Sequence, residues 1–293
     1  MNTIANNNYT MRFKRVVEYI DAHLDDNLSL DVLSDIAAYS KFHFHRQFSI
    51  LFGVNVSKYI QLKRMNRSSH QLAYRDTSIT EIAFDCCYES LEAFSRAFKK
   101  YFGQTPSNFR KSPDWDIWLI SYEPLAQMRT INMAQIYTNE DIDIVEFNET
   151  RIAVLEHVGH PRGIPNSVRK FIEWRKENGV PPSRSATFNI LHDNPDDVEL
   201  SEYRFDICAE VKSSVSPNDY GVVEKTIPSG LCAKLRYVGS YDQLEEAVSY
   251  IYGKWLPTSA MEPRDFPLFL QRVNFFPDAA EHEAITDIFL PLS

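Results

Sequence analysis

The stretch YSKFHFHRQFSILFGVNVSKY at residues 39–59 recurs in altered form as ESLEAFSRAFKKYFGQTPSNF at residues 89–109. The two stretches overlay at a constant offset of 50, with eight matching positions of which seven are identical. The matched pairs are Ser40/Ser90, Phe44/Phe94, Arg46/Arg96, Phe48/Phe98, Phe52/Phe102, Gly53/Gly103, Ser57/Ser107 and Tyr59/Phe109. Self-similarity of this kind indicates a duplicated supersecondary unit.

Each copy has the pattern of a helix-turn-helix unit. Three matched phenylalanines are spaced by four residues, which places them on one helix face. The matched serine before each trio is a candidate N-cap, and the matched glycine after it is a candidate left-handed C-cap. A shorter amphipathic helix precedes each trio, opened by Ser29 in the first copy and by a candidate capping box, Ser78–Glu81, in the second. Residues 13–24 and 56–72 suit a leading helix and a longer connecting helix.

The side chains beside the phenylalanine stripes are the candidates for DNA contact. Arg46 and Arg96 each stand two residues after a core phenylalanine, so they point away from the core. An arginine there can donate to phosphates or to N7 and O6 of guanine. The alternative is a solvated helix face, but the same side chain recurs at the same place in both copies. His43 and His45 are two residues apart and share no face, which argues against a metal site.

The composition is that of a folded protein of two domains: 293 residues, 44% hydrophobic and 24% charged. No apolar run approaches the roughly 20 residues of a membrane-spanning helix, and the N-terminal residues lack the pattern of a signal peptide. Four cysteines without CxxC spacing fit the reducing cytoplasm. Residues 11–112 carry 15 basic and 11 acidic side chains, whereas residues 113–293 carry 16 and 29. This asymmetry is expected when only one domain meets phosphate.

Residues 11–111 resemble the DNA-binding domain of the AraC/XylS family. The resemblance is carried by LSLDVLSDIAAYSKFHFHRQFSILFG and ITEIAFDCCYESLEAFSRAFKKYFGQTPSNFRK, with Cys87 in place of the family's usual glycine. It implies an all-α double helix-turn-helix domain over residues 10–112, with recognition helices near 41–52 and 91–102. These helices would lie about one DNA turn apart, roughly 34 Å. The implied DNA contacts are Phe42, His43, His45, Arg46, Ser90, Leu91, Glu92, Ser95 and Arg96.

The second half contains another repeat. A linker over residues 113–139 includes the short apolar run WDIWLISY and leads to a second domain over 140–292. RIAVLEHVG at 151–159 overlays LCAKLRYVG at 231–239 at an offset of 80. Strands are predicted at 142–147, 151–158, 186–191, 203–211, 221–227, 231–238, 267–275 and 284–290, and helices at 164–177 and 241–255. The pattern predicts an α+β domain built from two strand-helix-strand-strand repeats.

This half resembles the GyrI-like effector-binding domain through AVLEHVGHP, SEYRFDICAEV, AKLRYVGSYDQLEEAVSYIYGKWLP and AITDIFLPL. The order of the two domains is that of the Rob-type regulators. Domains of this kind hold a ligand in a cleft between their halves, where an acidic residue among aromatic rings selects lipophilic cations. The family's glutamate, in a pattern like E-R-Y-x-N, is replaced here by Gln271. The candidate effector contacts are Glu156, Trp174, Tyr203, Tyr237, Trp255, Phe269 and Gln271.

Together these features favour a bacterial-type transcription regulator. We expect double-stranded DNA, RNA polymerase and a small-molecule effector as partners, and no cofactor, metal or membrane. Two alternatives concern the C-terminal domain, which would either hydrolyse small molecules or act as a protein-interaction module without any ligand. Hydrolysis is disfavoured because the amide of Gln271 cannot serve as a general base. The chain also lacks the P-loop, HExxH and GxSxG motifs, so we expect no enzyme.

Overall fold

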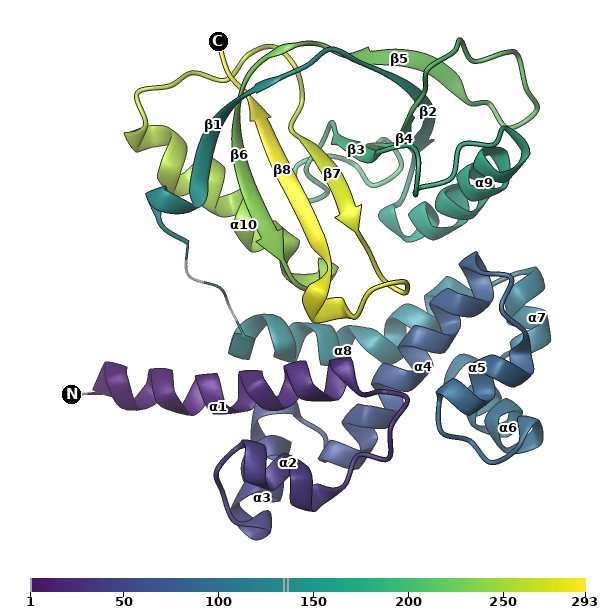
Figure 1. The fold of residues 1–293 in the computed structure, drawn as a ribbon, viewed down its shortest axis with the longest axis vertical. Helices are drawn as coiled ribbons and strands as arrows, with labels where there is room; N and C mark the ends of the chain where they lie inside the picture. The colour runs from purple at the N-terminus through teal and green to yellow at the C-terminus, as the bar shows by residue number, and fades with distance from the viewer. Residues whose placement is uncertain (1, 134, 136) are drawn as a thin grey trace. The chain divides into compact units, whose positions relative to one another are not determined.

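A computed structural model describes residues 2–133, 135 and 137–293, and the chain divides into two compact units (Figure 1). The helical unit runs to residue 134 and also contains Ser240–Gln243 and Phe276–His282. The sheet unit contains the remainder. This combination confirms the predicted pairing of an all-α part with an α+β part. Among the described residues, no helix has both the length and the apolar character needed to cross a membrane.

The helical unit is built from the duplicated pattern and its flanking helices. Its helices are α1 (Asn2–Ala22), α2 (Leu30–Ile36), α3 (Lys41–Phe52), α4 (Val56–Tyr74), α5 (Ile79–Asp85), α6 (Leu91–Phe102), α7 (Pro106–Lys111) and α8 (Trp115–Met133). The pairs α2/α3 and α5/α6 are the two helix-turn-helix units, and α3 and α6 coincide with the predicted recognition helices.

The ends of α3 and α6 are fixed by the residues that the repeat predicted. The side chains of Ser40 and Ser90 each accept a hydrogen bond from the backbone N–H three residues later. Gly53 and Gly103 end the two helices, each in the left-handed conformation at a φ of 68°. The capping box that begins at Ser78 is also confirmed. Helix lengths and positions are therefore set by local hydrogen bonds that the sequence specifies.

The tight turn before each recognition helix contains a left-handed residue that is not glycine. Ala38 has a φ of 54° before α3, and Cys87 has a φ of 58° before α6. A Cβ atom in this conformation costs about 1–2 kcal/mol. Cys87 thus adopts the conformation of the glycine that usually stands in its place.

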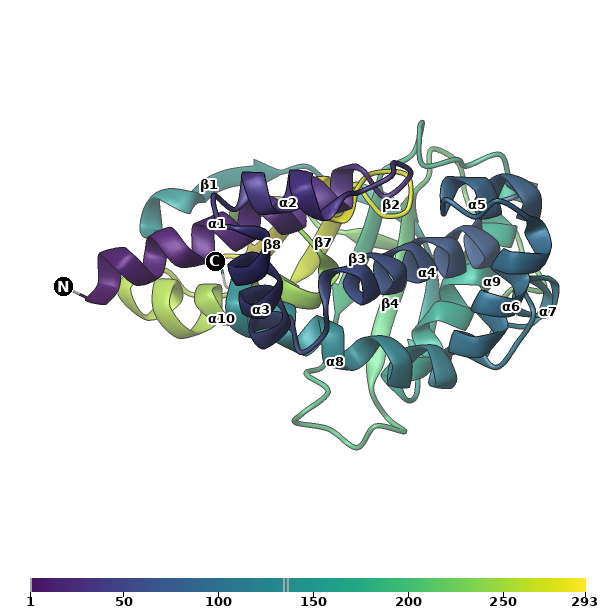
Figure 2. The ribbon, with the colours of Figure 1, turned by 90° about the horizontal axis from the view of Figure 1, so that it is seen from below.

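Two cores hold the helical unit together, and α4 contributes to both. The first phenylalanine trio is buried with α1 and with Tyr59 of α4. The second trio is buried with Leu72 of α4 and with Phe109. Figure 2 shows α4 running between α3 at one of its ends and α5 and α6 at the other. A helix of 19 residues is about 28 Å long, so α4 separates the recognition helices by a fixed span.

The segment predicted as a poorly patterned linker, 113–139, contains α8, which packs within the helical unit. Trp115 of α8 lies in the second core and Tyr122 lies in the first. Trp118 packs against both cores. The periodicity of α8 is concealed because the helix is apolar on its outer side as well, where Ile120 is 67% exposed. A one-faced pattern is what sequence reasoning recognises as an amphipathic helix.

In the described part of the chain, the sheet unit forms one eight-stranded antiparallel sheet in the order β1-β6-β8-β7-β3-β4-β2-β5. Its strands are β1 (Ile142–Phe147), β2 (Thr150–Val158), β3 (Thr187–Leu191), β4 (Arg204–Glu210), β5 (Val223–Ile227), β6 (Gly230–Val238), β7 (Phe269–Asn274) and β8 (Ile285–Pro291). Its helices are α9 (Ile164–Glu177) and α10 (Leu244–Tyr250), the latter continued by a π-helical turn, Ile251–Trp255. Every predicted strand and helix of this half is confirmed, with ends shifted by a few residues.

The strand order reflects a twofold relation between the repeats β2-α9-β3-β4 and β6-α10-β7-β8. The repeats meet where β3 pairs with β7, with Asn189 opposite Leu270 at the centre. β1 precedes the first repeat but pairs with β6 of the second, and β5 precedes the second repeat but pairs with β2 of the first. This exchange of flanking strands ties the repeats into one sheet.

The two faces of the sheet carry different layers. α9 packs on alternate residues of β2 and β4, and α10 packs on alternate residues of β6, β7 and β8. The strand registers place Leu155, Ile207, Leu270, Ile288 and Leu235 in one row, so both helices cover the same face. The opposite face, here called the inner face, carries a separate apolar cluster.

Four charged side chains are buried together inside the helical unit, and none was singled out from the sequence. Lys63 of α4 lies 3.2 Å from Asp21 of α1 and 2.5 Å from Glu281. Arg129 of α8 lies 3.3 Å from Asp21 and 2.6 Å from Glu281. Each of the four side chains is at most 7% exposed. Burial alone would raise the pKa of Glu281, but Lys63 and Arg129 outweigh burial and hold its pKa well below the ordinary value.

Replacing Glu281 by Gln should destabilise the helical unit at neutral pH by about 3–5 kcal/mol, since it removes a buried carboxylate that pairs with both Lys63 and Arg129. A depressed pKa contributes stability above the unfolded-state value, about 4.3, and that stability is lost as the pH falls below it. The difference in the free energy of unfolding between wild type and Glu281→Gln should therefore be largest at pH 7 and should shrink below about pH 4. Urea unfolding followed by circular dichroism from pH 3 to pH 7 measures it. The control is Asp278→Asn, in an exposed pair with Arg75, which should cost under about 1 kcal/mol; a pH-independent difference would contradict the expectation.

Candidate DNA-binding and effector-binding sites

The sequence-predicted contacts on α3 all lie on its solvent-facing side. Phe42 is 71% exposed, and His43, His45 and Arg46 are exposed as well. The phenylalanine trio on the opposite side is buried, so the phase of the helix is the one that the spacing predicted. The exposed side of α3 thus carries the ring of Phe42 beside the guanidinium of Arg46, with the imidazoles of His43 and His45 on either side of them.

The corresponding surface of α6 is similar in position but different in chemistry. Leu91, Glu92 and Arg96 are exposed, whereas Ser90 and Ser95 are half-buried. The Ser90 oxygen accepts the N–H of residue 93 at 3.2 Å, so its lone pairs serve the helix cap. Lys99 and Lys100 in the last turn are also exposed, which extends the surface with two cations that can meet phosphates. Neither lysine is among the contacts implied by the resemblance.

Arg46 and Arg96 are not used to hold the fold, in contrast to other arginines of the helical unit. Arg64 donates to the backbone oxygens of Leu24 and Asp26, and Arg110 donates to that of Thr77.

For the two matched arginines on α3 and α6, no ion pair or hydrogen bond occurs within residues 2–133, 135 and 137–293. Their guanidinium groups keep all five donors for an external acceptor.

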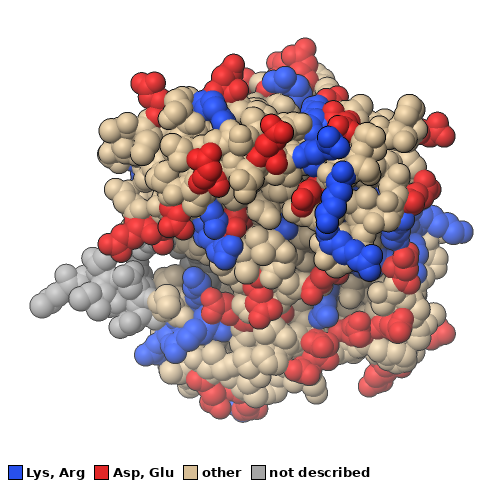
Figure 3. Space-filling view, turned by 45° about the horizontal axis from the view of Figure 1, so that its top comes forward, with Lys and Arg blue, Asp and Glu red and all other residues tan. Residues whose placement is uncertain are grey.

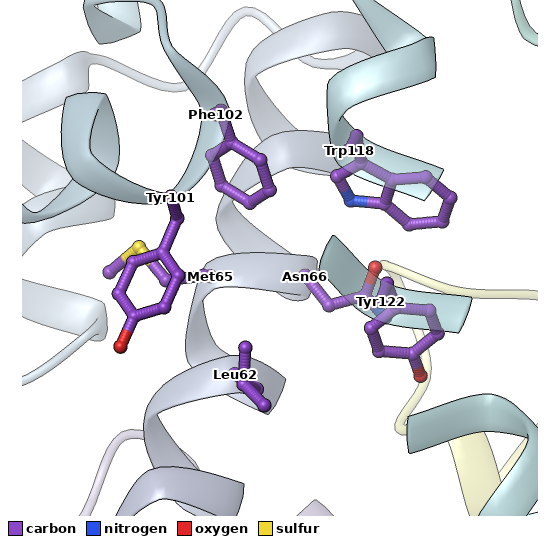
Figure 4. A pocket seen from close by; sticks show the side chains of 7 residues that line it. All are labelled: Leu62, Met65, Asn66, Tyr101, Phe102, Trp118 and Tyr122. Carbon is purple, nitrogen blue, oxygen red and sulfur yellow. The ribbon is translucent and has the colours of Figure 1, made fainter. Parts of the chain in front are cut away.

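The helical unit also contains a small cavity between α4, α6 and α8, about 190 Å³ including its open mouth (Figure 4). It is lined by Leu62, Met65, Asn66, Tyr101, Phe102, Trp118 and Tyr122. Among the described residues, the Asn66 side-chain oxygen and the Trp118 indole N–H have no hydrogen-bond partner. An acceptor and a donor beside one small space suit an ordered water molecule. The cavity therefore belongs to the packing of α8 against α4.

The aromatic candidates for the effector site do not come together in the sheet unit. Trp174 and Tyr203 are buried in the core beneath α9, and Tyr237 and Trp255 are buried in the core beneath α10. Phe269 lies on the inner face and is fully buried. Four of the five aromatic candidates thus fill helix-covered cores on the other side of the sheet.

The inner face carries an aromatic cluster that sequence reasoning found only in part. The rings of Phe147, Phe188 and Phe289 surround Phe269 at centroid distances of 4.9 to 6.4 Å. Their signal in the sequence was the alternation of apolar residues along β1, β3 and β8. A strand's alternation says which residues share a face but not which strand lies beside it.

Glu156 and Gln271 also lie on the inner face, in two separate groups of polar residues. The acidic group consists of Glu156, Asp206, Lys225 and His192. Lys225 lies 2.6 Å from Glu156 and 3.0 Å from Asp206, and His192 lies 3.0 Å from Asp206. Burial would raise the pKa of Asp206, but its hydrogen bonds with His192 and Lys225 lower it below the ordinary value.

The basic group occupies the position related to the acidic group by the twofold relation of the repeats. It consists of Asp287, Arg236, Lys234 and Gln271. Arg236 donates two hydrogen bonds to Asp287 at 2.7 and 2.8 Å, and Lys234 lies 3.5 Å from the same carboxylate. Gln271 stands beside Asp287 in the register of β7 and β8. Counting the carboxylates, lysines and arginine alone, two carboxylates and one ammonium give the acidic group −1, and one carboxylate and two cations give the basic group +1.

The outer surface of the protein shows no comparable segregation on the face drawn in Figure 3. There, lysine and arginine side chains are interspersed with aspartate and glutamate side chains. Alternating charge of this kind is typical of a solvated surface and not of a nucleic-acid-binding groove.

Comparison with known proteins matches both halves. A family model described as a GyrI-like small molecule binding domain matches residues 140–293, and one described as a helix-turn-helix domain matches residues 33–112. The chain is similar to the probable transcriptional regulator YgiV of Escherichia coli (strain K12), with 34% identity over 154 residues, or 52% of this chain and 96% of that protein. It is also similar to the right origin-binding protein of Escherichia coli (strain K12), with 32% identity over 142 residues, or 48% of each chain.

Among solved structures, the chain is similar to the crystal structure of the DNA-binding domain of AdpA in complex with a target DNA. The identity is 26%, the match covers 33% of this chain and 87% of that chain, and the TM-score is 0.32. The two family matches agree with both resemblances inferred from the sequence and with the order of the two domains.

Replacing Arg46 by Ala should lower the affinity for a preferred duplex by about 1–3 kcal/mol and relax the preference at one base step. Arg96→Ala should do the same at a second step. Neither side chain supports the fold, so both variants should keep the wild-type melting temperature. Fluorescence anisotropy with a preferred duplex and a scrambled duplex measures the effect. Arg162→Ala, which removes an exposed arginine from the sheet unit, is the matched control, and an isotherm unchanged in the double variant would refute the assignment.

Proposed function

Because the chain belongs to the family defined by the GyrI-like small molecule binding domain, we propose that it is a DNA-binding transcription regulator with an effector-responsive sheet unit. The helical unit binds double-stranded DNA with α3 and α6. The contacts are made by Phe42, His43, His45, Arg46, Ser90, Leu91, Glu92, Ser95 and Arg96. RNA polymerase is the partner through which a bound regulator changes transcription, and the cytoplasm is where its four unpaired cysteines stay reduced.

The observation that carries the proposal is the pair Arg46 and Arg96. They stand at equivalent positions of two structurally repeated helices, exposed on the side opposite each core. A single exposed arginine is common on any helix, but two equivalent ones at the ends of a rigid spacer match the periodicity of a duplex. The span of α4, about 28 Å, is close to one turn of DNA, roughly 34 Å.

The proposed effector site is the inner face, where the acidic and basic groups flank the phenylalanine cluster. Each cation there already has a carboxylate partner, and Gln271 contributes an uncharged amide where the family has a carboxylate. The face therefore offers hydrogen bonds beside an apolar cluster without a surplus of negative charge, and it favours ligands other than lipophilic cations. No observation on the described residues favours hydrolysis.

The DNA-binding proposal is tested by selecting preferred duplexes from a random pool and footprinting the protein on one of them. We expect protection of two major-groove segments on one side of the duplex, about 10 base pairs apart. Inserting five base pairs between them turns one segment to the opposite side, so affinity should fall by about tenfold or more. An insertion placed outside the two segments is the control. Equal affinity for both inserted duplexes would contradict simultaneous binding by α3 and α6.

The effector proposal is tested by thermal shift with size-matched lipophilic cations, anions and neutral aromatic compounds. A ligand at about 100 times its Kd stabilises the folded state by about 2.7 kcal/mol, which raises the Tm by several degrees. We expect hits among neutral or anionic compounds, and a gain in cation binding in the variant Gln271→Glu. Hits confined to cations in the wild type would contradict the charge argument. A screen in which no compound changes the Tm would favour the ligand-free interaction module.

A further inference from the structure

The connection between β7 and β8 leaves the sheet unit and belongs to the helical unit. Phe276–His282 begins two residues after the end of β7 and ends three residues before the start of β8. These strands carry Gln271 and Asp287 of the basic group on the inner face. Because the linking residues are so few, a change in the position of either strand must act on this segment.

One face of α4 receives the segment. Lys63, Asn66 and His70 are spaced by three and four residues, so they line one side of the helix. Lys63 lies 2.5 Å from Glu281, and the Asn66 amide N–H donates to Glu281 at 2.8 Å. The ring of His70 meets the ring of Phe276 edge to face, with centroids 4.9 Å apart. The helix that spaces the two recognition helices is thus also the one that binds this segment.

A second contact at the end of α4 is of a different kind. Arg75, which caps α4, forms an ion pair with Asp278 whose carboxylate is 58% exposed. Water can replace either partner of such a pair at small cost. It therefore offers a matched comparison for the buried contact of Glu281, whose side chain is 7% exposed.

The burial of Glu281 gives its contact an all-or-none character. With Glu281 in place, Lys63 and Arg129 each lie within 3.3 Å of both Asp21 and Glu281. If the segment withdraws, Lys63 and Arg129 both lose a buried carboxylate, and the charge left inside the helical unit must be hydrated or expelled. An intermediate position would satisfy neither the carboxylate nor the cations, so the buried contact is expected to form or break as a whole.

We propose that Glu281 couples the inner face of the sheet unit to α4. DNA binding by α3 and α6 then alters the conformation of β7 and β8, and a change in these strands alters DNA binding. The coupling deepens the proposed regulator function and rests on it. The coupling can be tested without knowing the effector, because linkage is reciprocal. If a ligand of the sheet unit alters the helical unit, a ligand of the helical unit must alter the sheet unit.

The test is hydrogen exchange of the full chain with and without a duplex selected from the random pool. In the wild type, DNA should change the exchange rates of β7 and β8 amides by about fivefold or more, the lower end of ordinary coupling. In Glu281→Gln that change should fall below about twofold while DNA is still bound. Asp278→Asn, which alters the same segment at its exposed ion pair, should keep the wild-type response.

A second variant separates coupling from stability. Lys63→Gln with Glu281→Gln removes one charge of each sign and leaves Asp21 paired with Arg129, so stability should recover relative to Glu281→Gln alone. The response of β7 and β8 to DNA should stay lost. The inference is overturned if either variant keeps the wild-type response, or if DNA-bound wild type shows no response in these strands. A wild type that selects no duplex sequence would instead overturn the regulator function itself.

Discussion

The ammonium group of Lys63 imposes the constraint on which the helical unit depends. It is fully buried in the middle of α4, and an unpaired cation there would cost several kcal/mol. Its two carboxylate partners come from α1 and from the segment between β7 and β8, and Arg129 of α8 completes the balance. Four segments far apart in the sequence must therefore be in place together before any of these charges is satisfied. Apolar packing alone would tolerate small shifts of these helices, whereas the charge cluster specifies one arrangement.

This constraint acts on the helix that determines DNA-binding geometry. α4 contributes to both phenylalanine cores and spaces α3 from α6, so fixing α4 fixes the relation of the two recognition helices. The arginines of the helical unit divide their roles accordingly. Arg64 and Arg110 are used on backbone carbonyls, and Arg46 and Arg96 are left for an external acceptor. A rigid spacer with free donors at each end is the physical requirement for binding successive major-groove segments from one side.

The sheet unit is also built from two repeats, but its repeats carry different charges. Its two repeats place Asp206 and Asp287 at equivalent positions on the inner face, both nearly buried. Their cationic partners are not equivalent, since Lys225 comes from a flanking strand and Arg236 from within a repeat. Symmetry of the backbone with asymmetry of the charges gives the face two ends of opposite sign. A ligand bound there would have one preferred orientation, which a symmetric site would not provide.

Local sequence determined most of the helices and strands of this protein. The phenylalanine spacing, the serine and glycine caps and the alternation along the strands depend on contacts within a few residues, and they predicted α3, α6, every strand and the exposure of Arg46 and Arg96. Tertiary structure decided what depends on partners distant in the chain. It buried the aromatic candidates Trp174 and Tyr237 beneath helices, and it packed α8, apolar on several faces, across both cores. It also brought Glu281 to Lys63, 218 positions away in the sequence. A buried charge carries no periodic signal, because its partners are chosen by the fold and not by its neighbours.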